Sequence, residues 1–220
     1  MKRNIAFLCL LGMSLLITAA NAGTVQPDWV GPNIPLNPTD GHYGFEDGVD
    51  GQVVASNVAG VVFTTTMGYD WIYADIRTGG YNMRYPLVGN FCTWLGVSGD
   101  EGRIDFTDGT ATYFSALVST PSYIQLDAYD ENGVLVDSAT FSGSNLDTGK
   151  MIRLTVQAPA IAYVMMHDSG NYWIMDEICT DAPGVESDGT PVPEFPSFAV
   201  SVCAIVGMLL TVMIVKRRES

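Results

Sequence analysis

Basic residues are scarce through the middle of this 220-residue chain. Residues 23–192 hold five Lys or Arg against 22 Asp or Glu, a net charge of −17. Binding to nucleic acid requires cations that neutralise phosphates, so this composition excludes a nucleic-acid-binding protein. We expect most of these carboxylates to lie on a solvated surface, where surplus charge favours solubility. Cation binding or adaptation to a salty exterior would also produce such acidity.

The sequence also lacks the motifs that usually carry catalysis. It has no Gly-x-Ser-x-Gly, no His-Glu-x-x-His and no glycine-rich phosphate loop, and its two histidines, His42 and His167, stand far apart. Paired carboxylates for glycoside hydrolysis exist in any domain this acidic. However, a middle region of about 160–170 residues is a small scaffold for an enzyme with a cleft. We therefore predict that the protein is not an enzyme.

Cysteine is scarce as well. Of the four cysteines, Cys9 and Cys203 lie in the hydrophobic ends, which leaves Cys92 and Cys179 in the middle region. In an exported chain of this length two thiols favour a disulfide, with two buried free thiols as the alternative. No Cys-x-x-Cys and no pair of histidines accompanies them, which argues against a zinc site.

The N-terminus has the pattern of a secretory signal peptide over residues 1–22. Lys2 and Arg3 precede an apolar run at Ile5–Ile17, and Ala20-Asn21-Ala22 provides small residues for cleavage after Ala22. An uncleaved N-terminal anchor is the alternative. In either case the sequence that follows is predicted to be exported.

The C-terminus contains a second hydrophobic segment, long enough for a membrane. Residues 197–215 are 19 residues without a charge, and a helix of that length spans most of a bilayer core of about 30 Å. The cations Lys216, Arg217 and Arg218 follow and should hold the C-terminal tail in the cytoplasm. This predicts a transmembrane helix at 197–215, with the domain and its N-terminus at the extracellular face of the cell membrane. A buried core helix would not end against three cations with nothing left to pack on.

A short motif stands at the start of this segment: Pro193, Glu194, Phe195, Pro196 and Ser197. Its two prolines disfavour helix and should keep the chain extended, which suits a protease-like cleavage site. The motif, the hydrophobic helix and the terminal Arg217-Arg218 together resemble the PEF-CTERM sorting signal of archaeal surface proteins, here over residues 193–220. The resemblance implies an archaeosortase, a membrane-embedded cysteine transpeptidase that would cut near the motif and transfer the new C-terminus to a membrane lipid. A permanent single-span anchor is the alternative.

The region between the two ends has the pattern of an all-β domain. Short runs rich in Val, Ile, Thr, Tyr and Phe are separated by Gly, Asp, Asn and Pro, and no long amphipathic helix is visible. This spacing predicts an antiparallel β-sandwich or jelly roll over residues 41–183, between an irregular lead-in at 23–40 and a linker at 184–192. The expected strands are 42–46, 61–65, 71–75, 91–95, 102–106, 111–118, 123–129, 135–141, 151–156, 161–167 and 172–179.

Acidic clusters open and close the predicted domain, at Glu46-Asp47 and at Asp176-Glu177. Since the first and last strands of a sandwich often lie side by side, these carboxylates and nearby carbonyls could hold Ca²⁺, which takes 6–8 oxygen ligands. The arrangement loosely resembles carbohydrate-binding-module and galactose-binding-like jelly rolls, in which an early Phe-Glu strand and a late Asp-containing strand flank a structural calcium. That resemblance implies Glu46 and Asp176 as calcium ligands, with Asp47 as a further candidate. Ordinary strand-end acids are the alternative.

Aromatic residues concentrate between Met67 and Trp94, next to Asp, Asn and Arg. Sugar rings need a flat apolar face and planar polar groups, so this composition indicates a carbohydrate site. Trp71 and Trp94 lie on predicted strands and are expected in the core, whereas the predicted loop at 77–89 offers surface residues. The predicted ligand-binding residues are Tyr81, Asn82, Arg84 and Tyr85.

Together these features predict an exported, surface-anchored β-sandwich protein of an archaeon with a binding, adhesin-like or cell-envelope role. Carbohydrate is the expected ligand class, and the expected partners are an archaeosortase, the membrane and glycans. Two alternatives remain open at this point: a small glycan-active hydrolase, and a purely structural envelope protein.

Overall fold

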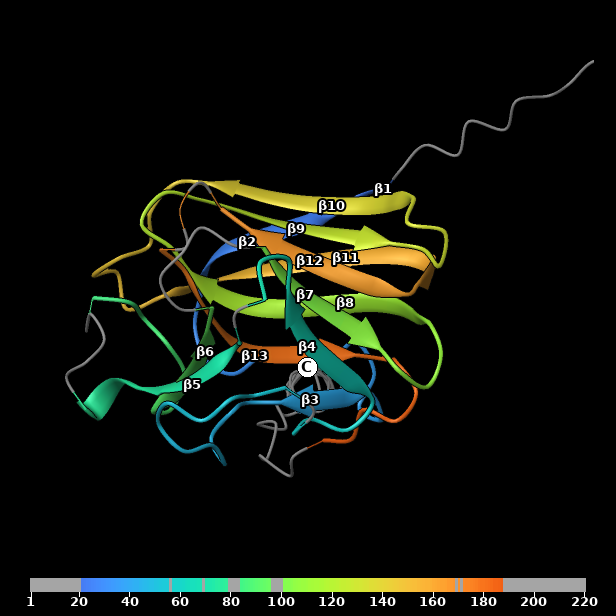
Figure 1. Cartoon of the computed structure of the whole chain (residues 1–220). Helices are drawn as coiled ribbons and strands as arrows, with labels where there is room; N and C mark the ends of the chain where they lie inside the picture. The colour runs from blue at the N-terminus through green and yellow to red at the C-terminus, as the bar shows by residue number, and fades with distance from the viewer. Residues whose placement is uncertain are drawn as a thin grey trace, which may run out of the picture.

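The computed structural model describes residues 21–55, 57–68, 70–78, 84–95, 101–168, 170 and 172–187. Within these residues thirteen strands form two sheets that pack face to face as two layers (Figure 1). The six-stranded sheet has the order β1 (Asn21–Ala22), β10 (Leu135–Ser142), β9 (Tyr123–Tyr129), β12 (Tyr163–His167), β7 (Gly102–Phe106), β4 (Val61–Thr65). The seven-stranded sheet has the order β2 (Thr24–Trp29), β11 (Met151–Ile161), β8 (Ala111–Ser119), β13 (Ile174–Thr180), β6 (Phe91–Trp94), β5 (Ile72–Asp75), and β3 (Gly41–Tyr43) pairs with β13.

The predicted all-β, two-sheet sandwich is therefore confirmed. Every strand pair is antiparallel except β1 with β10, which is parallel and only two residues long. The strands β4, β7 and β9 have the predicted bounds. The first and last predicted strands do lie side by side, as β3 and β13.

Strand β2 corrects the prediction of an irregular lead-in. It pairs antiparallel with β11, with Val25 opposite Leu154. Its side chains are mostly exposed and do not alternate between core and solvent. Pro27 and Asp28, which has a φ of 63°, interrupt the pattern, and an edge strand tolerates such residues. Backbone pairing rather than hydrophobic patterning makes this strand, so the sequence pattern does not predict it.

The core lies between the two sheets and is rich in aromatic residues. Trp71 and Trp173 are each 1% exposed and meet edge to face, with ring centroids 5.6 Å apart. The Trp71 indole also donates to the carbonyl of Thr64 at 2.7 Å. The prediction that Trp71 belongs to the core is confirmed, whereas Trp94 is only half-buried.

The predicted disulfide is not formed in the structure, where Cys92 and Cys179 are both buried thiols. Their strands, β6 and β13, are neighbours, with Thr93 opposite Met175. If that register continues, Cys92 lies opposite Asp176, three residues from Cys179. Three residues of strand measure about 10 Å, beyond the roughly 4.4–6.8 Å between Cα atoms that a disulfide allows. The alternative of two buried thiols fits this register.

Both predicted hydrophobic ends lie almost entirely outside the described residues. The sorting motif at 193–197, the segment 197–215 and residues 1–20 of the predicted signal peptide are in this group. Among the residues that the structure describes, none forms a helix long and apolar enough to span a membrane.

Candidate functional sites

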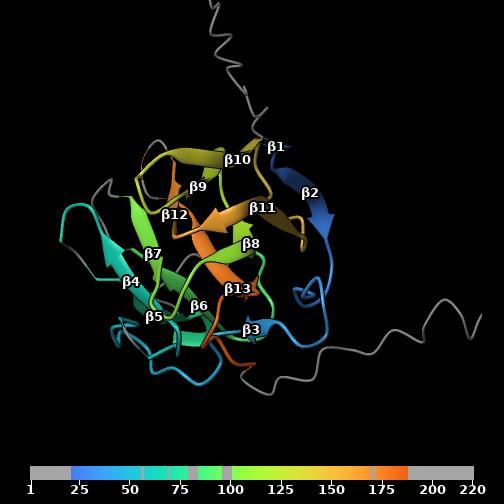
Figure 2. The ribbon, with the colours of Figure 1, turned by 90° about the vertical axis from the view of Figure 1, so that its right-hand side faces the viewer.

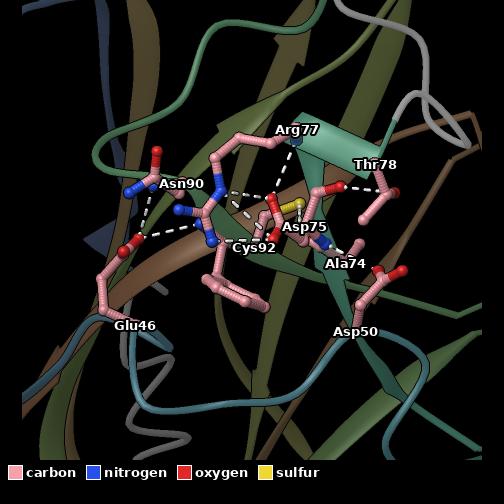
Figure 3. A network of polar contacts seen from close by, with 9 residues as sticks. Glu46, Asp50, Ala74, Asp75, Arg77, Thr78, Asn90 and Cys92 are labelled. Atoms are coloured by element: carbon pink, nitrogen blue, oxygen red, sulfur yellow. Dashed lines mark hydrogen bonds and ion pairs between the residues drawn. The ribbon is translucent and has the colours of Figure 1, made fainter.

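Glu46 projects from the end of β3 toward the loop that precedes β6. The preceding residue, Phe45, is fully buried and has a φ of 62°, a conformation that a bulky residue adopts only at a cost. Its ring packs edge to face on Tyr43 at 5.0 Å. The turn directs the Glu46 carboxylate to the amides of Asn90 and Phe91, which donate to Oε1 at 2.8 and 2.9 Å (Figure 3).

Gly89 permits this contact between Glu46 and the loop. A Cβ atom at position 89 would lie 2.2 Å from Glu46 Oε1, and the residue has a φ of 72°. Only glycine satisfies both conditions without strain. Close by, Arg77 binds both carboxylate oxygens of Asp75 and lies over the Phe91 ring at 5.6 Å. Hydrogen bonds from Arg77 lower the pKa of Asp75.

Asp176 reaches the same loop from β13. Its side chain is fully buried where the register of β13 with β8 shifts, and Oδ2 accepts the Val88 amide at 2.6 Å. No described residue hydrogen-bonds to Oδ1. Burial raises the pKa of Asp176 well above its ordinary value, and the charges of Glu177 and Glu46 raise it further. The structure thus brings Glu46 and Asp176 to one loop, residues 88–91.

Asp47 faces a different feature. It accepts a hydrogen bond from the hydroxyl of Tyr43, which also contacts the hydroxyl of Tyr73 at 2.8 Å. Asp47 and Glu46 both line a cavity of about 440 Å³ together with Tyr43, Asn57, Val58, Ala59, Glu186 and Ser187. Among the described residues, no three His, Cys, Asp or Glu side chains are arranged to hold a metal ion. A cation at this end of the sandwich would therefore need backbone carbonyls as additional ligands.

The predicted ligand-binding loop is only partly described, because Tyr81 and Asn82 lie outside the described residues. Arg84 forms an exposed ion pair with Asp147 at 2.7 Å. Tyr85 donates to the carbonyl of Tyr172 at 2.7 Å, and its ring packs on a small cluster that contains Cys92. Arg84 and Tyr85 are thus engaged in contacts between loops, while Tyr172 is 67% exposed.

A second candidate site lies on the outer surface of the six-stranded sheet, where β9, β12 and β7 are neighbours. We call it the polar face, and it comprises Arg103, Gln125, Asp127, Tyr129, Tyr163 and His167. Tyr129 and Tyr163 lie opposite each other in register and stack with centroids 4.9 Å apart and planes 7° from parallel. The guanidinium of Arg103 covers the other side of Tyr163, 3.7 Å from its centroid, and binds Asp105 with three hydrogen bonds.

Asp127 is the centre of the hydrogen-bonded part of the polar face. Gln125 donates to both of its oxygens at 2.8 and 2.9 Å, Ser138 donates to Oδ1, and His167 lies 3.3 Å from Oδ2. Burial opposes ionisation of Asp127, but its hydrogen bonds with His167, Ser138 and Gln125 outweigh it and lower the pKa. The hydrogen bond to Asp127 correspondingly raises the pKa of His167. At mildly acidic pH the two groups form an ion pair.

Sequence reasoning missed the polar face. Its residues come from three strands that are not consecutive in the chain, and their contacts depend on the order β9–β12–β7. The available signal was the alternation within the predicted strand 123–129, which places Gln125, Asp127 and Tyr129 on one side.

No protein-family model matches the chain, and no curated protein matches it. Among solved structures, the chain is similar to a mutant of a family 29 carbohydrate-binding module, with 8% identity, a TM-score of 0.32 and coverage of 79% of this chain and 99% of the module. It is also similar to the module CsCBM6-3 from Clostridium stercorarium in complex with cellobiose, with 18% identity, a TM-score of 0.29 and coverage of 54% and 92%. For a family 6 module from Clostridium cellulolyticum in complex with xylose, the identity is 15%, the TM-score is 0.28, and the coverage is 63% of this chain and 95% of the module. Scores this low carry no functional weight, and the sandwich architecture rests on the strand pairing.

Proposed function

We propose that this protein is a non-catalytic carbohydrate-binding domain and that the polar face binds the glycan. One observation carries the proposal: planar polar side chains and stacked tyrosines are held in fixed positions on a sheet surface by contacts with one another. Arg103 and its neighbour Asp105 keep 38% and 32% of their side chains exposed, and His167 keeps 25%, whereas Asp127 beneath them keeps 7%. Arg103, Asp105 and His167 are therefore positioned by the fold and still within reach of a ligand.

The chemistry of the polar face suits a polyol. Asp105, Gln125 and Arg103 offer acceptors and donors close together, as adjacent sugar hydroxyls require, and the edges of Tyr129 and Tyr163 supply apolar surface. Asp127, which is 5% exposed, holds Gln125 and His167 in place. Because these side chains already hold one another, little side-chain entropy would be lost on binding. The face carries both Arg103 and carboxylates, which favours a neutral glycan over a strongly charged one.

Binding to a panel of immobilised polysaccharides tests this proposal. We expect retention of the full chain without release of sugar, and at least tenfold weaker binding for Tyr163→Ala. The matched control is Tyr172→Ala, which removes an exposed tyrosine outside the polar face and should bind as the unmodified protein does. Sugar release would instead favour a small glycan-active hydrolase. Absence of binding together with regular self-assembly would favour a structural envelope protein.

We also propose that a hard cation, with Ca²⁺ as the leading candidate, binds between Glu46, Asp176 and the loop at 88–91. Support comes from Asp176 Oδ1, a buried carboxylate oxygen with no hydrogen-bond partner among the described residues. A cation would neutralise this group, whereas Asp47 is engaged with Tyr43 and is left out of the proposed ligands. Thermal unfolding with and without a chelator tests the idea. Saturation at a hundred times Kd stabilises by about 2.7 kcal/mol, so an unchanged Tm, or an equal shift in Asp176→Asn, would refute it.

Export and anchoring form the third part of the proposal. We propose that the domain is secreted by its N-terminal signal and attached at the cell surface through the sorting motif at 193–197, with an archaeosortase as the processing enzyme. The sequence pattern at the two ends supports this. Mass spectrometry of the mature protein from its native host tests it, because processing predicts loss of both ends and a lipid at the new C-terminus. A full-length chain, with Lys2 and Ser220 present and no lipid, would contradict it.

A further inference from the structure

Gly23 lies where the chain passes from one sheet to the other. The strand β1 pairs with β10 in the six-stranded sheet, and β2 pairs with β11 in the seven-stranded sheet, so the two lie together at one edge of the sandwich (Figure 2). The amide of Gly23 donates to the carbonyl of Ser138 at 2.9 Å. A Cβ atom at residue 23 would lie 2.8 Å from Ala139 Cβ, Ser138 O and Thr155 O. Only glycine therefore fits this close approach of three backbones.

Asp137 is buried beside Gly23, with 2% of its surface exposed. Its carboxylate accepts the amides of Gln157 at 2.7 Å and Ser138 at 2.8 Å, and the Gly23 amide, which donates to the carbonyl of Ser138, lies beside it. Burial raises the pKa of Asp137, while these three amides lower it. Within the described residues no cationic side chain forms an ion pair with Asp137. A buried carboxylate held only by amides lacks a counter-charge, which is costly.

We propose that cleavage of the chain after Ala22 creates this counter-charge, with the new α-ammonium group of Gly23 forming a buried ion pair with Asp137. Hydrolysis adds water across the bond between Ala22 and Gly23. The carboxylate leaves with Ala22, and the nitrogen stays on Gly23 and takes up a proton. The inference rests on the proposed export, since it requires a signal peptide that is removed at this bond.

The proposed ion pair requires cleavage at the bond between Ala22 and Gly23 and at no neighbouring bond. Cleavage one residue earlier or later would place the ammonium group on Ala22 or Thr24, away from the Asp137 carboxylate. The ammonium group has three N–H donors where the amide has one, so it keeps the hydrogen bond to Ser138 and adds a charge-assisted one to Asp137. Ala22 itself is exposed, so the bond lies at the surface of the sandwich. Signal removal would thus replace the two-residue pairing of β1 with β10 by an ion pair at the edge where the two sheets meet.

The test compares the processed and uncut forms of the full chain, produced in an exporting host and purified in detergent. Ala20→Arg blocks processing because it removes the small residue at the third position on the N-terminal side of the cleaved bond. We expect Asp137→Asn to lower the Tm of the processed chain by several degrees. In the uncut chain the same change should lower the Tm less, because it costs only a hydrogen bond from the Gln157 or Ser138 amide and no ion pair. Asp130→Asn, in an exposed turn, is the matched control and should act equally on both forms.

Two results would overturn the proposal. One is an N-terminal residue other than Gly23 in the mature protein, found by N-terminal sequencing. The other is an equal effect of Asp137→Asn on both forms. If Asp137→Asn does not fold, the ion pair can be tested by the rate at which an amine-reactive reagent modifies the mature N-terminus. We expect a rate at least tenfold lower in the folded than in the unfolded protein, and equal rates would refute the ion pair. None of these readouts depends on glycan binding.

Discussion

The two outer faces of the sandwich use polar residues in opposite ways. On the seven-stranded sheet the segment after β2 covers the strands, and Asn33 is fully buried there. Its side-chain amide donates to the carbonyls of Ser115 and Glu177, both at 3.2 Å. Arg153, only 8% exposed, donates to Ser115 Oγ and to the carbonyl of Ile34. On the six-stranded sheet the side chains of the polar face bond to one another, and all except Asp127, which is 5% exposed, keep part of their surface exposed.

We therefore expect the polar residues of the covered face to contribute to stability and those of the polar face to contribute to binding. On the covered face Asn33 and Arg153 satisfy backbone carbonyls of the strands or of the covering segment, so their loss leaves buried groups unpaired. On the polar face the contacts orient side chains that still have free surface, so their loss should alter ligand contacts more than the fold. Three substitutions, each with a matched control or condition, test this contrast.

The largest effect is expected on the covered face, from Asn33→Ala. This change leaves two buried carbonyls without their donor and should lower the free energy of unfolding by about 2–3 kcal/mol. Chemical denaturation measures it, with glycan affinity expected to stay unchanged. The control Asn37→Ala removes an exposed amide that donates to Asp40 and should change stability by no more than about 0.5 kcal/mol. Weakened glycan binding in Asn33→Ala at full folding would erase the contrast.

A smaller effect, of the opposite kind, is expected from Asp127→Asn on the polar face. The change keeps the shape but removes the charged acceptor that Gln125, Ser138 and His167 surround. We expect at least a tenfold increase in the glycan Kd, or about 1.4 kcal/mol, and a smaller loss of about 1 kcal/mol in the free energy of unfolding from the lost contact with His167. Isothermal titration measures the Kd. The control Asp147→Asn alters an exposed carboxylate paired with Arg84, and a loss of affinity there instead would move the site to the loop.

The smallest effect, about 1 kcal/mol, is expected from the ion pair of His167 with Asp127. Because the fold raises the pKa of His167, protonated His167 stabilises the folded state at pH values below its pKa in the unfolded chain, near 6.5. This contribution is lost as the pH rises through the pKa of His167 in the folded state. The lowered pKa of Asp127 contributes above its unfolded value near 3.9 and is lost as pH falls. Unfolding of His167→Gln should therefore differ from the unmodified protein most between about pH 4 and 6.5. A difference that persists unchanged at pH 9 would exclude the ion pair.

The sequence predicted the parts of the fold that depend on local pattern. Alternation within β9 and the aromatic strand around Trp71 were sufficient for their strands and for the core. It did not predict β2, because Pro27 and Asp28 conceal an edge strand that only its pairing with β11 defines. The pairing of β3 with β13 followed from general rules for sandwiches. The register that separates Cys92 from Cys179 did not.

The candidate sites show the same limit. Glu46 and Asp176 were chosen from the sequence, but their common attachment to the loop at 88–91 depends on the buried turn at Phe45 and on Gly89. The polar face depends on strand order, since Arg103 reaches Tyr163 only because β7 and β12 are neighbours. Contacts between strands that are distant in the chain are not visible in local pattern.

The sharpest test of the polar face as the glycan site is an amide hydrogen-exchange footprint of the protein with a bound oligosaccharide. We expect increased protection in β9 and β12, residues 123–129 and 163–167, and none in the segments around Arg84 and Tyr172. Protection confined to those two segments, with β9 and β12 unchanged, would show that the glycan binds elsewhere.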